Sequence, residues 1–337
     1  MEFRRVDPRD ELQFDAWFDI LHRAELERDH GRDEGWLPQE WRARALDETE
    51  PNYHQLFTLA GPGRAVAIGA LEVTREENLA WIRADLFVDP LQLRRGYGST
   101  MLAHLETSAR ELRRTSLLFW VVEDAPERGH GPSRGFAPRH GYEVVEENII
   151  RELTWPRPDG ELDHLHSTWV PKARDYEILS WRGAAASELA LGLALLKGVM
   201  PIEVPDSGFG VEFEVWHEHR FRLHEKRANA MGRDLLMAAA RHRQSGEIVG
   251  LSELTVSRER PETAYQWDTL VRRDHRGHSL GALLKIATMR IMEEGNYETK
   301  KIVTSNNALN TAMITVNDSL GAHPTGGVVV WRKKLTS

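Results

Sequence analysis

Apolar residues along the chain change repeatedly between the period of a strand and the period of a helix, which predicts a mixed α/β protein. Strand patterns occupy residues 2–6, 55–59, 65–73, 80–88, 117–122 and 144–153, and then 176–181, 235–241, 247–256, 263–271, 301–305 and 328–335. Helical spacing predicts helices at residues 10–30, 37–47, 99–113, 185–197, 211–230, 280–294 and 309–320.

One part of this pattern occurs twice. Residues 86–106 (LFVDPLQLRRGYGSTMLAHLE) and residues 269–289 (TLVRRDHRGHSLGALLKIATM) each predict a strand, an arginine-rich turn and an amphipathic helix. Val88 lies 183 positions before its match at 271, and flanking matches lie at offsets of 181 and 180. A nearly constant offset over roughly 70 residues indicates an internal duplication.

The segment between the two copies is rich in proline, glycine and acidic residues, which is typical of a connection. We therefore expect an N-terminal domain at residues 1–156, a linker at 157–174 and a C-terminal domain at 175–337. The length of 337 residues fits two domains.

Composition excludes several classes of function. The net charge of -8 argues against a nucleic-acid partner. The absence of cysteine excludes disulfides, cysteine-ligated metals and a thiol nucleophile. The longest apolar stretch, 189–196, ends at Lys197 and is too short to cross a membrane, and the N-terminus has no apolar signal segment. We expect a cytoplasmic protein with no membrane partner.

The repeated turn is the main candidate for chemistry. Glycines next to a helix N-terminus allow unpaired backbone N–H groups to approach an anion, most naturally a phosphate. Nearby arginines in an otherwise acidic chain favour this interpretation, although an ordinary glycine-containing turn with solvated arginines remains open. The chain contains neither a dinucleotide-binding nor a P-loop glycine pattern.

Both turns resemble the signature (Gln/Arg)-x-x-Gly-x-(Gly/Ala) of the GCN5-related N-acetyltransferases (GNAT). The whole chain resembles a tandem member, similar in architecture to the mycothiol synthases. The resemblance implies two tandem folds, each a twisted mixed β-sheet flanked by helices. It also implies acetyl-CoA as co-substrate, with its pyrophosphate at the turn and its pantetheine arm along the preceding strand.

The two copies match this signature unequally. The second copy keeps Arg276 and Gly281 but has Ser279 at the first glycine, whereas the first copy has Leu93 at the Gln/Arg position. A later family signature resembles residues 305–310 and 316–322 of the second copy. We therefore expect a catalytic C-terminal half and an N-terminal half that is degenerate or non-catalytic.

The resemblance implies a cofactor site at the positions that match the strand, the turn and the later asparagines. In the C-terminal half these positions are Leu270, Val271, Arg276, Gly277, His278, Ser279, Leu280, Gly281, Asn306 and Asn310. In the N-terminal half they are Val88, Arg94, Arg95, Gly96, Tyr97 and Gly98.

Acyl transfer to an amine needs a proton acceptor, a stabilised oxyanion and a proton for the leaving thiolate. Many family members use a tyrosine as the acid, and the matching position here is Asn317, which can hydrogen-bond but cannot act as that acid. Without cysteine, we expect direct attack by the amine in a ternary complex.

Glu253 and Asp268 on adjacent predicted strands are candidate bases. The alternative is that these carboxylates pair with Arg272 or Arg273, or face solvent. The residues HEHRFRLH at 217–224 also allow a metal interpretation, but their spacing favours a solvated helix face, and we expect no metal.

These observations predict an acetyl-CoA-dependent N-acetyltransferase that acts on a primary amine of a small molecule. A non-catalytic acyl-CoA-binding sensor or scaffold and a protein N-acetyltransferase remain as alternatives. We expect a monomer or a homodimer.

Overall fold

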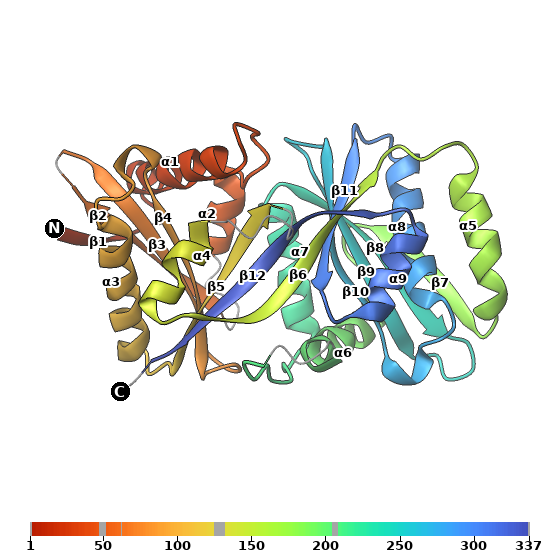
Figure 1. Cartoon of the computed structure of the whole chain (residues 1–337). Helices are drawn as coiled ribbons and strands as arrows, with labels where there is room; N and C mark the ends of the chain where they lie inside the picture. Colours follow the sequence, from red (N-terminus) through yellow and green to blue (C-terminus); the bar gives the residue numbers. More distant parts are fainter. Residues whose placement is uncertain (1, 47–51, 62, 125–131, 204–207, 336–337) are drawn as a thin grey trace. The chain divides into compact units, whose positions relative to one another are not determined.

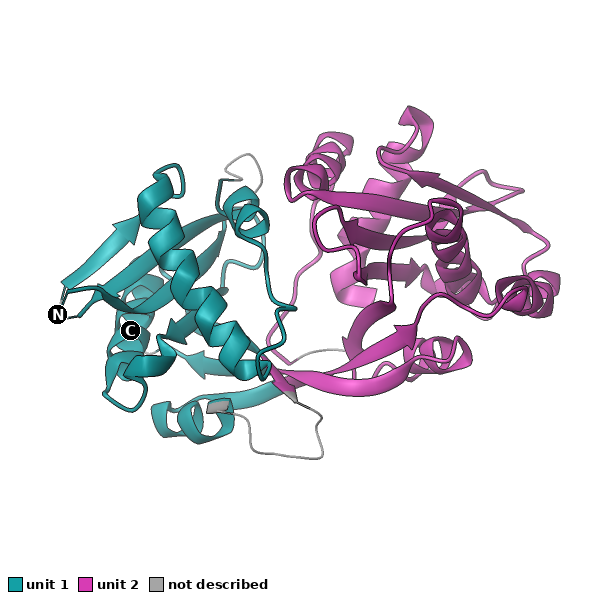
Figure 2. Ribbon diagram, turned by 90° about the horizontal axis from the view of Figure 1, so that it is seen from above, with its two compact units in different colours: residues 1–121, 133–145, 330–337 teal, residues 122–132, 146–329 magenta. Residues whose placement is uncertain are grey.

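The computed structural model describes residues 2–46, 52–61, 63–124, 132–203 and 208–335. The chain divides into two compact units, which are coloured separately in Figure 2. Unit 1 comprises residues 1–121, 133–145 and 330–337, and unit 2 comprises residues 122–132 and 146–329.

Unit 1 is a sheet with helices on both faces. Its strands follow the order β1 (Glu2–Val6), β2 (Asn52–Ala60), β3 (Ala65–Thr74), β4 (Trp81–Val88) and β5 (Ser116–Asp124). Its helices are α1 (Glu11–Arg28), α2 (Pro38–Leu46), α3 (Tyr97–Glu111) and α4 (Pro132–Phe136), with short 3-10 helices at Pro90–Gln92 and Pro138–His140. Neighbouring strands are antiparallel except β4 and β5, which are parallel.

Large apolar side chains hold the helices of unit 1 on the sheet. Trp17 and Trp41 from α1 and α2 are buried with Ile68 of β3. The other face is covered by α3, where a Cβ at Gly69 would lie 3.0 Å from the Leu105 side chain. Glycine at this position therefore allows the helix to pack closely on the strand.

Unit 2 repeats this arrangement (Figure 1). Its strands follow the order β6 (Glu143–Thr154), β11 (Lys301–Asn307), β10 (Thr263–Val271), β9 (Ile248–Ser257), β8 (Arg233–His242) and β7 (Tyr176–Arg182). Its helices are α5 (Glu161–Trp169), α6 (Ser187–Glu203), α7 (Glu218–Ala230), α8 (Leu280–Glu294) and α9 (Thr311–Ser319), with 3-10 helices at Val170–Lys172 and Arg273–His275.

The two faces of the sheet in unit 2 carry separate cores. Leu254 and Ile286 belong to a cluster on the side of α8, whereas Leu251 and Phe221 belong to a cluster on the side of α6 and α7. Because side chains alternate along a strand, Leu251 and Leu254 of β9 lie on opposite faces of the sheet. The predicted mixed α/β class is confirmed.

Strands β6 and β12 (His323–Lys334) each supply residues to both units. Residues 148–154 of β6 pair with β11 in unit 2. The end of β12 belongs to unit 1, where the backbone N–H of Leu335 donates to the carbonyl oxygen of Thr115 at 2.8 Å. The division of the chain thus differs from our predicted domain boundaries, because residues 146–156 belong to unit 2 and residues 330–337 belong to unit 1.

The predicted linker at 157–174 also differs from the structure. This segment contains α5, whose Leu162 is buried in the cluster on the side of α8. The prolines and glycines of this segment lie on either side of α5, so the composition of the whole segment did not indicate a helix with an apolar face.

Most predicted elements are present within a few residues of their predicted ends. The strands at 2–6 and 263–271 and the helix at 280–294 have the predicted bounds. The prediction that a helix ends at 197 was wrong, since α6 continues to Glu203 with Pro201 inside it. The predicted helix at 211–230 begins only at Glu218, because His217 caps it and accepts a hydrogen bond from the Arg220 N–H. Among the described helices, none is long and apolar enough to cross a membrane.

Candidate active site

The turn before the helix has the same backbone conformation in both units. In unit 1, Arg94 and Gly96 have φ angles of 60° and 84°, and in unit 2, Gly277 and Ser279 have φ angles of 86° and 59°. Each residue lies 183 positions from its counterpart. The left-handed positions are therefore equivalent, although glycine occupies a different one of the two in each copy.

Both turns lead directly into a helix. Helix α3 begins at Tyr97 after Gly96, and α8 begins at Leu280 after Ser279, with no side-chain cap at either position in the described structure. The first N–H groups of a helix lack partners within the helix, and the dipole there favours negative charge. Each turn is thus suited to bind a phosphate.

Arg276 is held in place by its own unit. Its Nε donates to the carbonyl oxygen of Val271 at 3.0 Å, and its Nη2 donates to Glu203 Oε2 at 2.7 Å. Arg273 also lies 3.5 Å from the Glu203 carboxylate. The Glu203 carboxylate at the end of α6 therefore pairs with both Arg273 and Arg276, which flank the turn.

Parallel neighbouring strands separate beside each turn. In unit 2, β10 pairs with β11 only from Thr263 to Gln266, while β10 continues along β9 to Val271. In unit 1, the paired part of β4 and β5 ends at Ala84, and β4 continues to Val88. Leu270, Val271 and Val88 therefore lie on the parts of the strands that have left their parallel neighbour.

A buried polar cluster lies on the α6 and α7 side of the sheet in unit 2. Lys197 Nζ donates to Glu253 Oε2 at 3.2 Å and forms a short hydrogen bond with Asp268. His224 Nε2 lies 3.1 Å from the same Glu253 oxygen. Glu253 is fully buried, whereas the side chain of Asp268 is 28 % exposed.

The charges in this cluster stabilise one another. Burial alone would raise the pKa of the Glu253 carboxyl, but Lys197 and His224 hold that pKa well below its usual range. Burial alone would lower the pKa of the Lys197 ammonium, but Asp268 and Glu253 raise it. Glu253 therefore remains ionised beside a charged lysine.

Two buried atoms of the cluster have no hydrogen-bond partner among the described residues, namely Glu253 Oε1 and His224 Nδ1. The imidazole lies between Trp216 and Trp267, with ring centroids 6.0 and 5.9 Å away. Unpaired buried acceptors are costly, so these atoms are the ones most ready to receive hydrogen bonds from a ligand.

A second polar group lies on the other face, where α8 and α9 meet (Figure 1). Lys285 Nζ donates to Asn317 Oδ1 at 2.8 Å, and Asn317 Nδ2 donates to Asn306 Oδ1 at 3.0 Å. Lys285 and Asn317 are 3 % and 1 % exposed. Asn310 instead caps α9, where its Oδ1 accepts a hydrogen bond from the Met313 N–H.

The sequence comparison decides the family. The model of the acetyltransferase (GNAT) family matches residues 14–142 and 199–315, which together form most of the chain. The chain belongs to the GNAT family. This membership supports an acyltransferase activity.

Solved structures show that the tandem GNAT fold is shared. A tandem GNAT protein from the clavulanic acid biosynthesis pathway has 22 % identity and a TM-score of 0.77, with 100 % of this chain and 99 % of that chain covered. A GCN5-related N-acetyltransferase from Sphaerobacter thermophilus has 15 % identity, a TM-score of 0.64 and coverage of 100 % and 96 %. N-myristoyltransferase from Saccharomyces cerevisiae has 11 % identity, a TM-score of 0.58 and coverage of 98 % and 77 %. A comparison with curated protein sequences gives no match.

The GNAT residues predicted from the sequence therefore fall into three places. The turn residues lie at the starts of α3 and α8, the carboxylates lie on the α6 and α7 face, and the asparagines lie on the α9 face. The alternative partners for the carboxylates, Arg272 and Arg273, pair elsewhere in the described structure, with Asp274 and Glu203. Lys197 pairs with Glu253 and Asp268 instead.

Sequence reasoning missed Lys197 and Lys285 as site residues. Each lysine interrupts an apolar helical pattern, and a buried ammonium needs a specific partner. That interruption was the available signal. In the described part of the chain, no group of three or more histidines and carboxylates could hold a metal ion.

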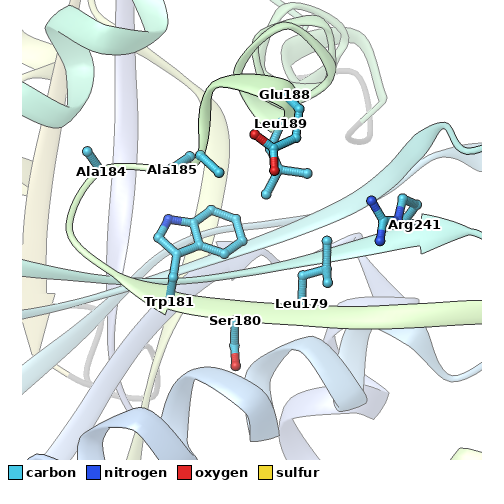
Figure 3. A pocket seen from close by; sticks show the side chains of 9 residues that line it. Leu179, Ser180, Trp181, Ala184, Ala185, Glu188, Leu189 and Arg241 are labelled. Carbon is cyan, nitrogen blue, oxygen red and sulfur yellow. The ribbon is translucent and has the colours of Figure 1, made fainter.

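A pocket of about 490 Å³ lies elsewhere in unit 2, between β7 and the start of α6 (Figure 3). Trp181 and Leu189 line it, while the Ser180 side chain points to the opposite side of the strand. None of the predicted site residues is among its lining residues. The turn and the two polar groups therefore remain the candidate site.

Proposed function

We propose that this GNAT protein transfers an acetyl group from acetyl-CoA to a primary amine of a small molecule, and that unit 2 performs the reaction. The separation of β10 from β11 directly beside the Ser279 turn carries this proposal. An open helix N-terminus suits a pyrophosphate, and a free strand edge suits an extended arm with amide groups. Acetyl-CoA contains both in this order.

The residues fit the cofactor in the following way. The N–H groups at Leu280 and Gly281 would hold the pyrophosphate, with Arg276 beside it. The backbone of Leu270 and Val271 would pair with the pantetheine arm. Glycine at 281 places no side chain at the start of α8, where a Cβ would be in ordinary contact with Val316 at 3.7 Å. The cofactor supplies the activated acetyl thioester.

The polar cluster suits a cationic acceptor. Two carboxylates face one lysine, so the cluster favours a further positive charge. We assign the partly exposed Asp268 to attract the acceptor ammonium. Glu253 Oε1 and His224 Nδ1 would accept hydrogen bonds from the ammonium, and the imidazole would take its proton before the amine attacks the thioester directly.

Unit 1 has the same turn but a different site, which favours unit 2 as the catalytic unit. Glu72, which matches Glu253, pairs with Arg44 at 3.3 Å and is partly exposed. His54 and Arg83 also lie 3.9 and 4.0 Å from the same Glu72 oxygen, so its described surroundings differ from those of Glu253. We propose that unit 1 either binds acyl-CoA without turnover or has a structural role.

The test combines binding and turnover with the full chain. Acetyl-CoA is expected to raise the thermal unfolding midpoint, and CoA release is expected with amines from a panel of amino acids, polyamines, aminoglycosides and peptide N-termini. Gly281→Trp, which fills the start of α8, is expected to abolish release, whereas the matched Gly98→Trp in unit 1 retains it. Circular dichroism checks that both variants fold.

Each alternative has its own outcome. Binding without release across the panel favours an acyl-CoA sensor, and release only with peptides favours a protein N-acetyltransferase. No stabilisation by any acyl-CoA contradicts the proposal, and loss of release in Gly98→Trp alone would assign the reaction to unit 1.

A further inference from the structure

Lys285 is a buried lysine without an ionic partner in the described structure. Its ammonium donates to a neutral amide, Asn317 Oδ1, at 2.8 Å, and no described carboxylate lies within ion-pair distance. By contrast, Lys197 in the same unit faces two carboxylates. A lysine buried beside an amide costs stability, so its presence here calls for a role other than packing.

The position of Lys285 connects it to the candidate active site. It lies on α8 one helical turn after Gly281, on the side that faces α9, because residues four apart share a helix face. Through Asn317, its hydrogen bonds continue to Asn306 on β11. Asn306 lies two residues beyond Thr304, the last residue of β11 that pairs with β10. The chain of hydrogen bonds thus reaches the point where the strands have separated.

Unit 1 contains no such group at the equivalent positions. Leu102 lies 183 positions before Lys285, and Ala137 lies 180 positions before Asn317. Ala137 and Asn317 each accept a backbone hydrogen bond from the residue five positions later, which confirms their equivalence. Both Leu102 and Ala137 are buried apolar residues. The same fold therefore packs well here without a lysine.

The surroundings control the charge of Lys285. Burial lowers the pKa of its ammonium to about 7. The charged groups on the neighbouring elements pair elsewhere, since Asp318 of α9 accepts from Arg151 at 3.1 Å and Asp163 of α5 accepts from Arg290 at 2.6 Å. On β11, Lys301 pairs with Glu152 at 3.2 Å. At neutral pH, Lys285 can therefore both hold and release a proton.

We propose that Lys285 is the proton donor to the thiolate of CoA when the acetyl group leaves it, with Asn317 positioning the ammonium. This inference rests on the proposed function of unit 2. The amine nitrogen forms a bond to the thioester carbon, and the carbon–sulfur bond then breaks with its electron pair on sulfur. Lys285 transfers a proton to the sulfur and becomes a neutral amine.

The protons balance over the whole reaction. The acceptor ammonium loses two protons on becoming an amide, one of which replaces the proton that Lys285 gave to CoA, while the other enters solvent. A thiol such as that of cysteine has a pKa of about 8.5, so transfer from an ammonium of lower pKa is favourable. An uncharged Lys285 after transfer also suits its buried site.

The test compares the wild type with Lys285→Met and with the double variant Lys285→Met/Asn317→Ala, which imitates the apolar pair of unit 1. We expect kcat for acetyl transfer to fall about 100-fold in both variants. The KM for acetyl-CoA should change less than threefold, because the pyrophosphate site is untouched. The wild-type kcat should decline above about pH 7 as Lys285 loses its proton, and this decline should disappear in the variants.

A purely structural lysine predicts other results. The double variant removes the buried ammonium together with its amide partner, and only Asn306 Oδ1 loses a donor, so it is expected to unfold within a few degrees of the wild type. Circular dichroism checks that both variants fold. Variants that keep kcat within threefold and the same pH profile overturn the role of Lys285 while leaving the proposed function intact. A wild type that binds acetyl-CoA but releases no CoA with any amine overturns both proposals.

Discussion

Ser279 and Gly96 occupy the same left-handed backbone position in the two copies of the turn, with φ angles of 59° and 84°. Glycine adopts this conformation without strain, whereas a residue with a Cβ pays roughly 1 kcal/mol. At the other left-handed position the glycine is in the second copy, because Gly277 is the residue equivalent to Arg94. Each copy thus retains one strained residue, in keeping with a turn whose shape is held by its surroundings.

The first prediction exchanges these residues. Ser279→Gly should raise the free energy of unfolding of unit 2 by about 0.5 kcal/mol. Relief of the backbone strain stabilises the folded unit, and the greater freedom of glycine in the unfolded chain offsets part of this gain. Gly96→Ser should lower that of unit 1 by about 1 kcal/mol. A Cβ at Gly96 meets nothing within 4 Å, so the loss reports the backbone alone. Denaturant unfolding measures both, and changes of the same sign would contradict equivalence of the turns.

Local pattern predicted the elements around the turns well, because their signals lie within a few residues. Alternation fixed the strand at 263–271, and spacing fixed the helix at 280–294. The repeat offset then identified two copies of one fold. What local pattern could not predict was the division of β6 and β12 between the units, since a strand reads the same whichever neighbour it pairs with.

The candidate site was predicted in part for a similar reason. The turn is a contiguous motif, so the sequence predicted its position directly before a helix in each copy. The partner of Glu253 lies 56 positions away on α6, and that of Asn317 lies 32 positions away on α8. Such pairs form only when elements pack, and a lysine within an apolar helix was the one local sign of them.

The second prediction concerns the buried ion pairs of Lys197. Lys197→Met should destabilise unit 2 by about 3 kcal/mol, because removing one partner leaves Glu253 charged, buried and short of its main partner. Adding Glu253→Gln should recover part of this loss. Thermal and denaturant unfolding of the single and double variants provide the measurement.

Lys301 supplies a matched control for this prediction. It pairs with Glu152 at 3.2 Å, but both side chains are partly exposed. Lys301→Met should therefore cost less than about 1 kcal/mol. Equal losses for the two lysines would show that burial of the Lys197 cluster contributes nothing.

The third prediction concerns acid stability. Lys197 and His224 hold the pKa of Glu253 below its usual value of 4.5. This carboxylate therefore stabilises the folded unit above about pH 4.5, and the benefit is lost as the pH falls through the lowered pKa. In Glu253→Gln, the unfolding free energy of unit 2 should fall less steeply with acidification, by up to about 1.4 kcal/mol per pH unit for one proton. Glu152→Gln serves as the partly exposed control, and an equal change of slope in it would refute the assignment to Glu253.

The fourth prediction tests the contribution of the last strand to unit 1. Trp331 is buried and donates its Nε1 hydrogen to Ser133 Oγ at 3.1 Å, and Lys333 Nζ donates to Glu106 Oε1 at 2.8 Å. Strand β12 also lies next to β5 in the sheet, so removing residues 330–337 should expose β5 of unit 1, even though these residues follow the whole of unit 2 in the sequence. Amide hydrogen exchange should become faster at 116–121 and remain unchanged at 263–271.

Trp331→Ala provides a milder change at the same place. Loss of a buried tryptophan should cost about 3 kcal/mol, and the faster exchange should again be confined to unit 1. If truncation instead accelerates exchange in β10 while β5 keeps its protection, the final residues stabilise unit 2 and the prediction is wrong. A confined effect would mean that unit 1 needs residues from both ends of the chain, so expression of residues 1–156 alone should give a poorly protected β5.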